Sequence, residues 1–571
     1  MTQDDTGAEE PLDAVETPDL YGAYPRLTPE QIDLLASDGR RAPAASGDVL
    51  MREGEPCGDF LVILSGSVVV LENYGTPDER VLRVHGPGRF LGELGLLHGQ
   101  AAFFTAVVRG PGEVLAVPVD RLRDVVARDP VLGDLILRAY LSRRDLLVGQ
   151  GAGFRILGSR YSPDTRRLRE FAARNRLPHR WIDLETDEEA EALLRRFSIR
   201  PEDTPIVLWR GEQLLRNPGN GELAALIGLP APPAFDETRC DLLIIGSGPA
   251  GLAAAVYGAS EGLETTVVDA IATGGQASTS SRIENYLGFP SGISGGELAE
   301  RAVIQARKFG ATISVPAEAA ALKAHDDHYS VGFADGTEAT GRAVVLATGA
   351  RYRRLAVPGI ERLEGSGIYY AATAFEAHEC RADPVAVVGG GNSAGQASLF
   401  LAQHVPRVHL LVRGADLGAA MSRYLAERIE HHPRIEVHLS TELGEVAGEN
   451  APEYLVVKNN RTGERHTVKA RALFVFIGAQ PCTAWLAGSV LLDARGYVLT
   501  GTDAQARAAP GSWAGLGREC LTLETTLPGV FAAGDVRSGS VKRVASAVGE
   551  GAMAVHLVHE HLGKTANAGT A

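Results

Sequence analysis

The chain has few cysteines, and none of them is paired in sequence. The five are scattered over 571 residues with no C-x-x-C spacing: Cys57, Cys240, Cys380, Cys482 and Cys520. Neither a disulfide framework nor a metal site is expected from such spacing. A cytoplasmic, reducing location is the expected one.

Basic charge and long apolar runs are also in short supply. The formal net charge is -15, which argues against nucleic-acid or anionic-membrane partners because both require a basic surface. No apolar run approaches the roughly 20 residues that cross a bilayer, so membrane insertion is not expected. The acidic N-terminus, MTQDDTGAEEPLDAVETPD, lacks the layout of a secretory signal and predicts a disordered tail over residues 1–22.

The length predicts several domains, because one hydrophobic core does not extend over so long a chain. Between residues 48 and 119, β-branched runs such as FLVILSGSVVVLENYG alternate with glycine turns. This pattern is typical of a small antiparallel β-barrel or jelly roll. Apolar residues at helical spacing follow over residues 121–147. Together they predict an N-terminal domain over residues 23–150.

A change of pattern near residue 154 predicts a different architecture. The segments FRILGS, HRWIDLE and TPIVLW read as strands, and SPDTRRLREFAARNR and DEEAEALLRRFSI read as helices. Their alternation predicts a small α/β domain over residues 152–230, followed by a proline-rich linker at 231–238. Beyond it, two strand, glycine-loop and helix units predict two Rossmann-like dinucleotide-binding domains.

The first of these units is CDLLIIGSGPAGLAAAVYGASEGLETTVVDA. Gly246 allows a tight turn, Gly248 lets a pyrophosphate approach the backbone, and Gly251 allows close helix–strand packing. The helix N-terminus stabilises phosphate charge. Asp269 ends the next strand, where a carboxylate can bind ribose hydroxyls.

Three later segments give this half of the chain a specific resemblance. TGGQASTSSRIENYLGFP and LPGVFAAGDVR are similar to flavin motifs of the thioredoxin reductase branch of the pyridine nucleotide–disulfide oxidoreductases, and VVLATGARYRRLAVPG is similar to the ATG turn between the domains of that family. The resemblance spans residues 239–562. It implies a homodimer and an FAD domain over residues 239–356 and 480–565. The implied FAD contacts are Gly246, Gly248, Pro249, Ala250, Gly251, Asp269, Gly274, Gly275, Gln276, Asn285, Gly349, Gly534, Asp535, Val544 and Ala545.

The second glycine loop, in PVAVVGGGNSAGQASLFLAQ, predicts an NAD(P)H-binding domain over residues 357–479. The next strand ends in Arg413, which can pair with a 2′-phosphate and favours NADPH over NADH. Gly414 and Gly418 stand where the family carries further arginines, so NADH stays possible. Arg423 could compensate for the missing arginines. The candidate residues are Gly389, Gly391, Asn392, Ser393, Ala394, Arg413 and Gly478.

The redox dithiol of the family is missing. Thioredoxin reductases carry C-A-T-C in this domain, whereas YYAATAFEAHEC places Ala371 and Ala374 at those positions. Alanine cannot form a mixed disulfide. Cys380 has no partner at usable spacing and is expected to be inert. No catalytic side chain is assigned, and Glu376 and His378 are expected at the surface.

The α/β domain over residues 152–230 also lacks a dithiol. Its order of elements resembles thioredoxin or glutaredoxin, with Thr204–Pro205 similar to the cis-proline turn of that fold. Ser162 and Thr165 stand where the cysteine pair would lie. Ser162 has no adjacent base, so we expect it to cap the following helix.

The N-terminal barrel contains GRFLGELGLLHGQAAFFTAVV, which resembles the phosphate cassette of cyclic-nucleotide-binding domains. Gly92, Glu93 and Thr105 match its ligand residues. Phe104 replaces the arginine that pairs with the cyclic phosphate, which weakens the case for cAMP or cGMP. Arg109 is a possible substitute. Another small ligand or a docking role is equally compatible.

These features predict an NAD(P)H-dependent FAD oxidoreductase that passes electrons from the flavin directly to an acceptor. Candidate acceptors are a ferredoxin- or flavodoxin-like protein, a quinone or a disulfide, and the N-terminal domain is a candidate regulator. One alternative is a non-catalytic flavin- and nucleotide-binding redox sensor or scaffold. Another is a thioredoxin-disulfide reductase that uses cysteines outside the usual motif.

Overall fold

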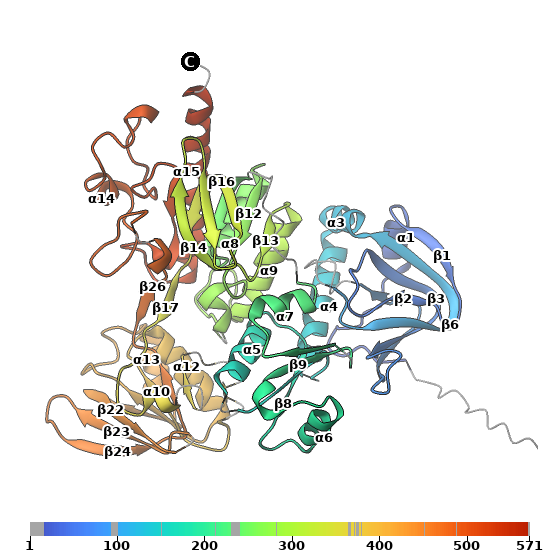
Figure 1. Cartoon of the computed structure of the whole chain (residues 1–571), viewed down its shortest axis with the longest axis horizontal. Helices are drawn as coiled ribbons and strands as arrows, with labels where there is room; N and C mark the ends of the chain where they lie inside the picture. The colour runs from blue at the N-terminus through green and yellow to red at the C-terminus, as the bar shows by residue number, and fades with distance from the viewer. Residues whose placement is uncertain are drawn as a thin grey trace, which may run out of the picture. The chain divides into compact units, whose positions relative to one another are not determined.

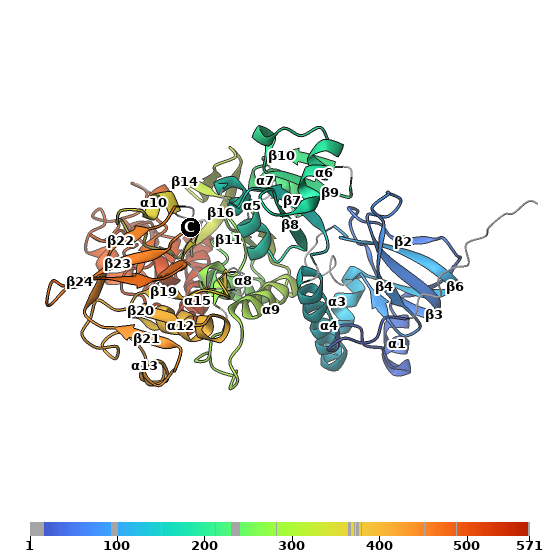
Figure 2. The same ribbon diagram turned by 90° about the horizontal axis from the view of Figure 1, so that it is seen from below.

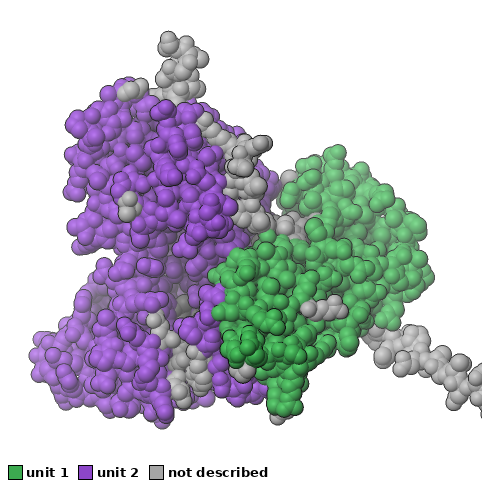
Figure 3. All heavy atoms as spheres, viewed as in Figure 1, with its two compact units in different colours: residues 1–157, 176–182, 189–229 green, residues 158–175, 183–188, 230–571 purple. Residues whose placement is uncertain are grey.

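The chain forms two compact units (Figure 3). The first comprises residues 1–157, 176–182 and 189–229, and the second comprises residues 158–175, 183–188 and 230–571. Among the described residues, no helix is long and apolar enough to cross a membrane. The computed structural model describes residues 16–92, 101–149, 151–160, 162–211, 213–229, 240–280, 282–363, 367–370, 372, 376–377, 380–449, 451–486 and 488–568.

The first unit begins with the predicted antiparallel β-structure (Figure 1). Its sheet order is β1-β6-β3-β4, with β2 paired to β6 and β5 to β3. Apolar side chains of β3, β5 and β6 form a core with the flanking helices. The elements are α1 (Pro29–Ala36), β1 (Arg40–Ala44), β2 (Val49–Met51), β3 (Asp59–Glu72), β4 (Arg80–His85), β5 (Phe90–Leu91), β6 (Thr105–Pro118), α3 (Val119–Arg128) and α4 (Pro130–Gly149).

Two details of this region differ from the sequence expectation. The helix expected over residues 121–147 is two helices, because Pro130 begins α4 after Asp129 leaves the helical conformation. Residues 1–15 of the predicted tail lie outside the described part of the chain. Thr17, within that predicted tail, exchanges hydrogen bonds with Val84 of β4. Order on the described side of the tail therefore begins before residue 22.

The next elements form a sheet in the order β10-β9-β7-β8. The Thr204–Pro205 peptide bond before β9 is cis, and the Ser162 hydroxyl accepts a hydrogen bond from the N–H of Thr165. Ser162 therefore caps α5, as the sequence predicts. The predicted linker at 231–238 lies outside the described residues. The elements are β7 (Phe154–Gly158), α5 (Pro163–Arg174), β8 (His179–Asp183), α6 (Glu188–Arg196), β9 (Ile206–Trp209), β10 (Gln213–Arg216) and α7 (Asn220–Leu226).

The first dinucleotide-binding region has a sheet in the order β13-β12-β11-β16-β15-β14, with β27 paired to β16. Strands β11, β12, β13, β16 and β27 are parallel, and β14 and β15 form an antiparallel extension. The elements are β11 (Cys240–Ile245), α8 (Pro249–Ser260), β12 (Thr265–Val268), a 3-10 turn η2 (Gly275–Thr279), α9 (Gly295–Lys308), β13 (Thr312–Ser314), β14 (Ala319–Ala324), β15 (Tyr329–Phe333), β16 (Glu338–Leu346), α14 (Gly501–Gln505), β27 (Val530–Ala532) and α15 (Val544–Ala568).

The second dinucleotide-binding region is inserted between two short strands, β17 (Ala350–Tyr352) and β26 (Ala479–Pro481), which pair with each other. Its parallel sheet has the order β18-β25-β19-β20-β21, and a smaller sheet, β22-β23-β24, packs on one face of it (Figure 2). The elements are α10 (Ile360–Leu363), β18 (Ile368–Tyr369), β19 (Val385–Val388), α12 (Asn392–His404), β20 (Val408–Leu411), α13 (Arg423–Glu430), β21 (Ile435–His438), β22 (Thr441–Ala447), β23 (Tyr454–Asn459), β24 (Arg465–Lys469) and β25 (Ala472–Val475).

Candidate functional site

The loop between β11 and α8 gives each glycine of the first fingerprint a distinct environment. Gly246 has a φ of +106°, and a β-carbon there would lie 2.3 Å from the carbonyl oxygen of Ala347. A β-carbon on Gly251 would lie 1.8 Å from the oxygen of Gly246. Gly248 differs, because a β-carbon on this residue would have its nearest neighbour 3.8 Å away. The open space beside Gly248, at the N-terminus of α8, fits a pyrophosphate.

Asp269 lies at the end of β12 beside the same loop. Its carboxylate accepts hydrogen bonds from the backbone N–H and hydroxyl of Ser247, at 2.8 and 2.9 Å. It also accepts from the N–H groups of Ile271 and Ala272. A carboxylate has about four acceptor sites, so Asp269 is positioned but extensively bonded before any ribose arrives.

The glycine pair after β12 closes against the fingerprint loop. Gly274 and Gly275 have φ values of +93° and +57°, and the N–H of Gly274 donates to the oxygen of Ser247 at 2.8 Å. A β-carbon on Gly275 would lie 2.9 Å from the α-carbon of Gly248. Gln276 and Asn285 are exposed. The structure thus brings Gly274 and Gly275 to the fingerprint loop and leaves these two polar side chains at the surface.

The end of β27 contributes the last set of predicted flavin residues. Asp535 is half-buried, and burial raises the pKa of its carboxyl, opposed by Lys542 and assisted by Glu550. No hydrogen-bond donor for this carboxylate is present among the described residues, so it can accept bonds from ligand hydroxyls. A β-carbon on Gly534 would lie 2.9 Å from the β-carbon of Ala250. The turn at Gly534 therefore packs closely against α8.

Glu550 of α15 is a residue that the sequence reasoning missed. Its carboxylate accepts a hydrogen bond from the N–H of Gly534 at 2.7 Å and pairs with Arg537 at 2.6 Å. It therefore fixes the turn that carries Asp535.

Of the other predicted flavin residues, Gly349 has a φ of +66° and its oxygen accepts a hydrogen bond from the N–H of Cys482. Val544 and Ala545 begin α15.

The second glycine loop, between β19 and α12, repeats the arrangement of the first. A β-carbon on Gly389, whose φ is +146°, would lie 2.3 Å from the oxygen of Phe476 and 3.1 Å from the β-carbon of Ala394. One on Gly391 would have its nearest neighbour 3.9 Å away, leaving space beside the N-terminus of α12. The side-chain oxygen of Asn392 is taken by the N–H of Ser422 at 2.6 Å.

The loop after β20 carries the predicted phosphate partner. Arg413 is exposed, and its side chain forms no ion pair within the described ranges. Arg423 is 92% exposed and pairs with Glu427 on its own helix at 2.7 Å. Asp416 lies between them and accepts from the N–H of Gly418 at 3.0 Å. Arg413 is therefore the cation of this loop that can bind a 2′-phosphate. The nearby carboxylate of Asp416 would repel that phosphate.

Tyr352, also missed by the sequence reasoning, links the two loops electrostatically. Burial raises the pKa of its hydroxyl, a hydrogen bond with Ser393 lowers it, and the charge of Asp535 raises it. Ser393 lies in the first turn of α12, directly after the second glycine loop, and Asp535 lies in the turn after β27. Gly478, at the start of the return to β26, has a φ of +96°, and its oxygen accepts from the N–H of Arg353 at 2.9 Å.

The family model described as pyridine nucleotide-disulphide oxidoreductase matches residues 240–551, which is more than half of the chain. The chain belongs to this family. It is an NAD(P)H-dependent flavoprotein oxidoreductase of the thioredoxin reductase-like kind. A model described as cyclic nucleotide-binding domain matches residues 43–129. The architecture is therefore a fusion of these two kinds of domain.

Similar proteins and structures agree with this assignment. Thioredoxin reductase of Treponema pallidum is 34% identical over 326 residues, which cover 57% of this chain and 98% of that protein. A 34.2 kDa protein in the rubredoxin operon of Clostridium pasteurianum is 32% identical, over 57% of this chain and 99% of its own. The crystal structure of Lactococcus lactis thioredoxin reductase matches with a TM-score of 0.51 and 26% identity, covering 57% of this chain and 99% of that one.

Three cysteines of the oxidoreductase region have a raised pKa, which disfavours the reactive thiolate. Ala371 and Ala374, at the dithiol positions, lie outside the described residues, as does His378. Burial raises the pKa of Cys240 to about 11 and that of Cys520 to about 12, and it raises the pKa of Cys482 as well. Cys380 is buried. Because the thiolate is the nucleophile, these environments disfavour disulfide exchange.

In the cyclic-nucleotide-binding domain, Glu93 lies outside the described residues, whereas Gly92, Phe104 and Thr105 lie within them. Phe104 is buried, so this position carries core packing instead of a phosphate partner. The hydroxyl of Thr105 accepts from the N–H of Glu53 at 3.1 Å. Gly92 has a φ of +98° and lies next to Cys57. Cys57 lines a cavity of about 260 Å³ formed by residues 49–52, 55–59 and 61.

Proposed function

We propose that this oxidoreductase binds FAD at the first glycine loop and NADPH at the second, and reduces an acceptor directly from the flavin. The observation that carries the proposal is the matched pair of open positions at Gly248 and Gly391. Each begins a helix whose N-terminal N–H groups can bind a pyrophosphate, and in each loop a second glycine packs too tightly for any side chain. Two loops built this way support two dinucleotides.

When bound, FAD would supply the redox chemistry, a two-electron transfer from the nicotinamide to an acceptor. The protein's contribution is binding and position. Asp269 and Asp535 are proposed to bind the ribose and ribityl hydroxyls, with a ribose competing for the Asp269 oxygens that already accept hydrogen bonds within the protein. Glu550 holds the turn that carries Asp535. Arg413 is proposed to pair with the 2′-phosphate, which would favour NADPH. The negative charge of Asp416 opposes a 2′-phosphate, so NADH remains the alternative substrate.

The acceptor is a ferredoxin- or flavodoxin-like protein, a quinone, or a small-molecule or protein disulfide. Ala371 and Ala374 cannot carry electrons to thioredoxin as a C-A-T-C pair does. Similarity to proteins named thioredoxin reductase therefore supports the flavin and nicotinamide chemistry of this chain. It gives less support to thioredoxin as the acceptor. A homodimer and a cytoplasmic location belong to the same proposal. The cyclic-nucleotide-binding domain is proposed to regulate electron transfer through a small ligand.

The test is steady-state oxidation of NADPH by the full-length flavoprotein with benzoquinone, ferricyanide or a disulfide as acceptor. Gly391→Ala is the variant of choice, since its β-carbon fits the protein but occupies the pyrophosphate space. We expect the variant to retain FAD and lose at least about tenfold in kcat/KM for NADPH. Stoichiometric binding of NADPH without turnover by any acceptor would favour the sensor or scaffold.

A second experiment separates direct transfer from hidden disulfide chemistry. A variant with all five cysteines replaced by serine removes every thiol of the chain. Direct transfer from the flavin predicts an unchanged rate with the same acceptor. A loss of activity, with FAD content unchanged, would support a reductase that uses cysteines outside the usual motif.

A further inference from the structure

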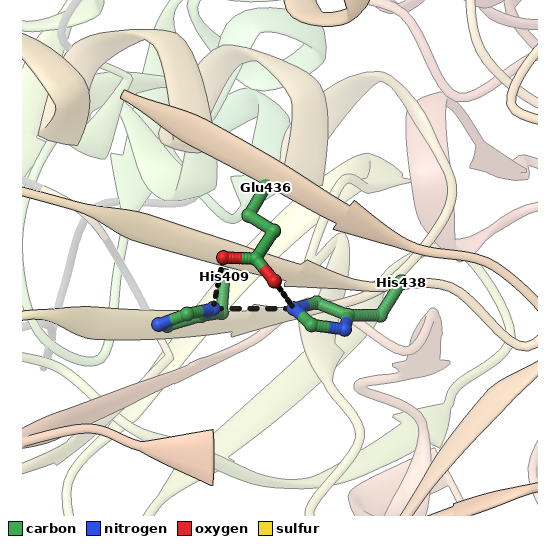
Figure 4. Close-up of side chains that lie close together, drawn as sticks. All are labelled: His409, Glu436 and His438. Atoms are coloured by element: carbon green, nitrogen blue, oxygen red, sulfur yellow. Dashed lines mark hydrogen bonds and ion pairs between the residues drawn. The ribbon is translucent and has the colours of Figure 1, made fainter. Parts of the chain in front are cut away.

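Two histidines and a glutamate converge on one face of the second parallel sheet (Figure 4). Strands β20 and β21 are parallel neighbours, with His409 opposite Glu436 and Leu411 opposite His438. Alternate residues of a strand share a face. The three side chains therefore lie on the face that Leu411 helps to bury against β22-β23-β24.

The distances among the ligand atoms fit one metal ion. Nδ1 of His409 and Nε2 of His438 are 3.1 Å apart. Nδ1 of His409 is 3.5 Å from Oε2 of Glu436, and Nε2 of His438 is 3.5 Å from the other carboxylate oxygen, Oε1. With one ligand atom taken from each residue, all three lie within 4.8 Å of one another. Ligand atoms around tetrahedral zinc, with bonds of about 2.0–2.2 Å, are separated by about 3.3–3.6 Å, so a small adjustment brings the set to that spacing.

The protonation states also favour coordination. Burial lowers the pKa of His409, although Glu436 opposes the shift, and burial likewise lowers the pKa of His438. A lowered pKa favours the neutral imidazole, which is the form that binds metals. The histidine side chains are 12% and 15% exposed and that of Glu436 is 45% exposed, so a solvent molecule can reach a fourth coordination position.

Two other groups face the cluster. Arg407 donates a hydrogen bond to Glu436 at 3.0 Å and competes with a cation for that carboxylate. The exposed ring of His466, on β24, lies 6.1 Å from that of His438, measured between centroids. Without an ion, the contact between the two nitrogens requires that one imidazole donate its proton to the other. A metal ion replaces that proton.

We propose that His409, Glu436 and His438 form a divalent transition-metal site with one position open to solvent, separate from the dinucleotide sites. Two imidazoles and a carboxylate select zinc or a similar ion over magnesium or calcium, which prefer oxygen ligands. The metal would join β20 to β21. Arg413 lies in the loop that follows β20. The spacing of the ligands in sequence gives no metal motif, because strand pairing alone brings them together.

The experiment uses the FAD-loaded full chain after treatment with a chelator and dialysis. Co²⁺ is titrated while its visible d–d bands are recorded, and Zn²⁺ is titrated against a chromophoric chelator. We expect one equivalent of either ion per chain, with Co²⁺ bands of tetrahedral or five-coordinate intensity. The absence of a stoichiometric site would overturn the proposal.

Variants locate the site. His409→Ala/His438→Ala and, separately, Glu436→Gln should weaken Zn²⁺ binding at least about tenfold. The matched control is His325→Ala/His328→Ala, which removes another pair of neighbouring histidines next to an acid, Asp327. It should bind Zn²⁺ as the unmodified chain does. Undiminished binding by Glu436→Gln would contradict the assignment even if the double variant failed to fold.

Discussion

Gly251 approaches Gly246 so closely that a β-carbon on Gly251 would lie 1.8 Å from the carbonyl oxygen of Gly246. Gly248, between them, has no such neighbour. Gly251→Ala should therefore lower the free energy of unfolding by about 1–3 kcal/mol or more, through overpacking. Gly248→Ala should leave the stability of the apoprotein within about 0.5 kcal/mol and weaken FAD binding. Urea unfolding of the apoproteins and FAD titration separate the two effects; equal stability losses would show that both glycines serve packing alone.

Asp535→Asn should separate flavin binding from stability. Because the folded pKa of Asp535 is raised by burial, its carboxylate disfavours the folded apoprotein as pH rises from about 3.9, the ordinary value, through the raised value. The apo variant should thus be at least as stable as the unmodified apoprotein at pH 7, and equal to it below the ordinary pKa. FAD affinity should fall about tenfold. An apo variant that is markedly less stable at pH 7 would mean that Asp535 has a stabilising partner.

Arg413→Ala tests coenzyme choice. A charged hydrogen bond contributes about 1.5–3 kcal/mol, so the KM for NADPH should rise about ten- to hundredfold while that for NADH stays within about twofold. Arg423→Ala is the control, because Arg423 is already paired with Glu427 on an exposed helix. Initial rates at varied coenzyme concentration give both values. A parallel rise for NADPH and NADH would remove Arg413 from 2′-phosphate recognition.

A buried ion pair should dominate the stability of the C-terminal part of the flavin-binding region. Arg518 and Glu524 are 2.6 Å apart, with side chains 4% and 0% exposed, and Glu524 also accepts from the indole of Trp513. Arg518→Met leaves a buried carboxylate without its cation and should cost about 3–5 kcal/mol. Arg301→Met, which breaks a half-exposed pair with Glu297 on α9, should cost less than about 1 kcal/mol. Comparable losses in urea unfolding would contradict this ranking.

The sequence predicts local geometry better than contacts between distant segments. The glycine loops are recognisable because Gly246, Gly251 and Gly389 have steric requirements that few residues other than glycine meet, and the cap at Ser162 depends on a neighbour three residues away. The break between α3 and α4 follows from Pro130, a local signal that helical periodicity alone does not register. These are features that a short window of residues determines.

Contacts across the fold give no such signal. Glu550 reaches Gly534 across 16 residues, and His409 reaches His438 across 29. Nothing in the spacing of these residues predicts that helix α15 or the pairing of β20 with β21 brings them together. Tyr352 likewise reads as an ordinary aromatic residue until the fold places it near Ser393. Such relationships depend on tertiary packing, which periodicity does not encode.

NADPH is proposed to reduce a flavin held by this chain without a dithiol. Anaerobic titration of the purified full-length flavoprotein with NADPH, followed by NADH on a second sample, tests it through the flavin absorbance. We expect full bleaching by about one equivalent of NADPH, because the flavin takes two electrons and there is no C-A-T-C dithiol to take two more. An unbleached flavin with NADPH bound, in the full chain and after removal of the N-terminal domain, would contradict it.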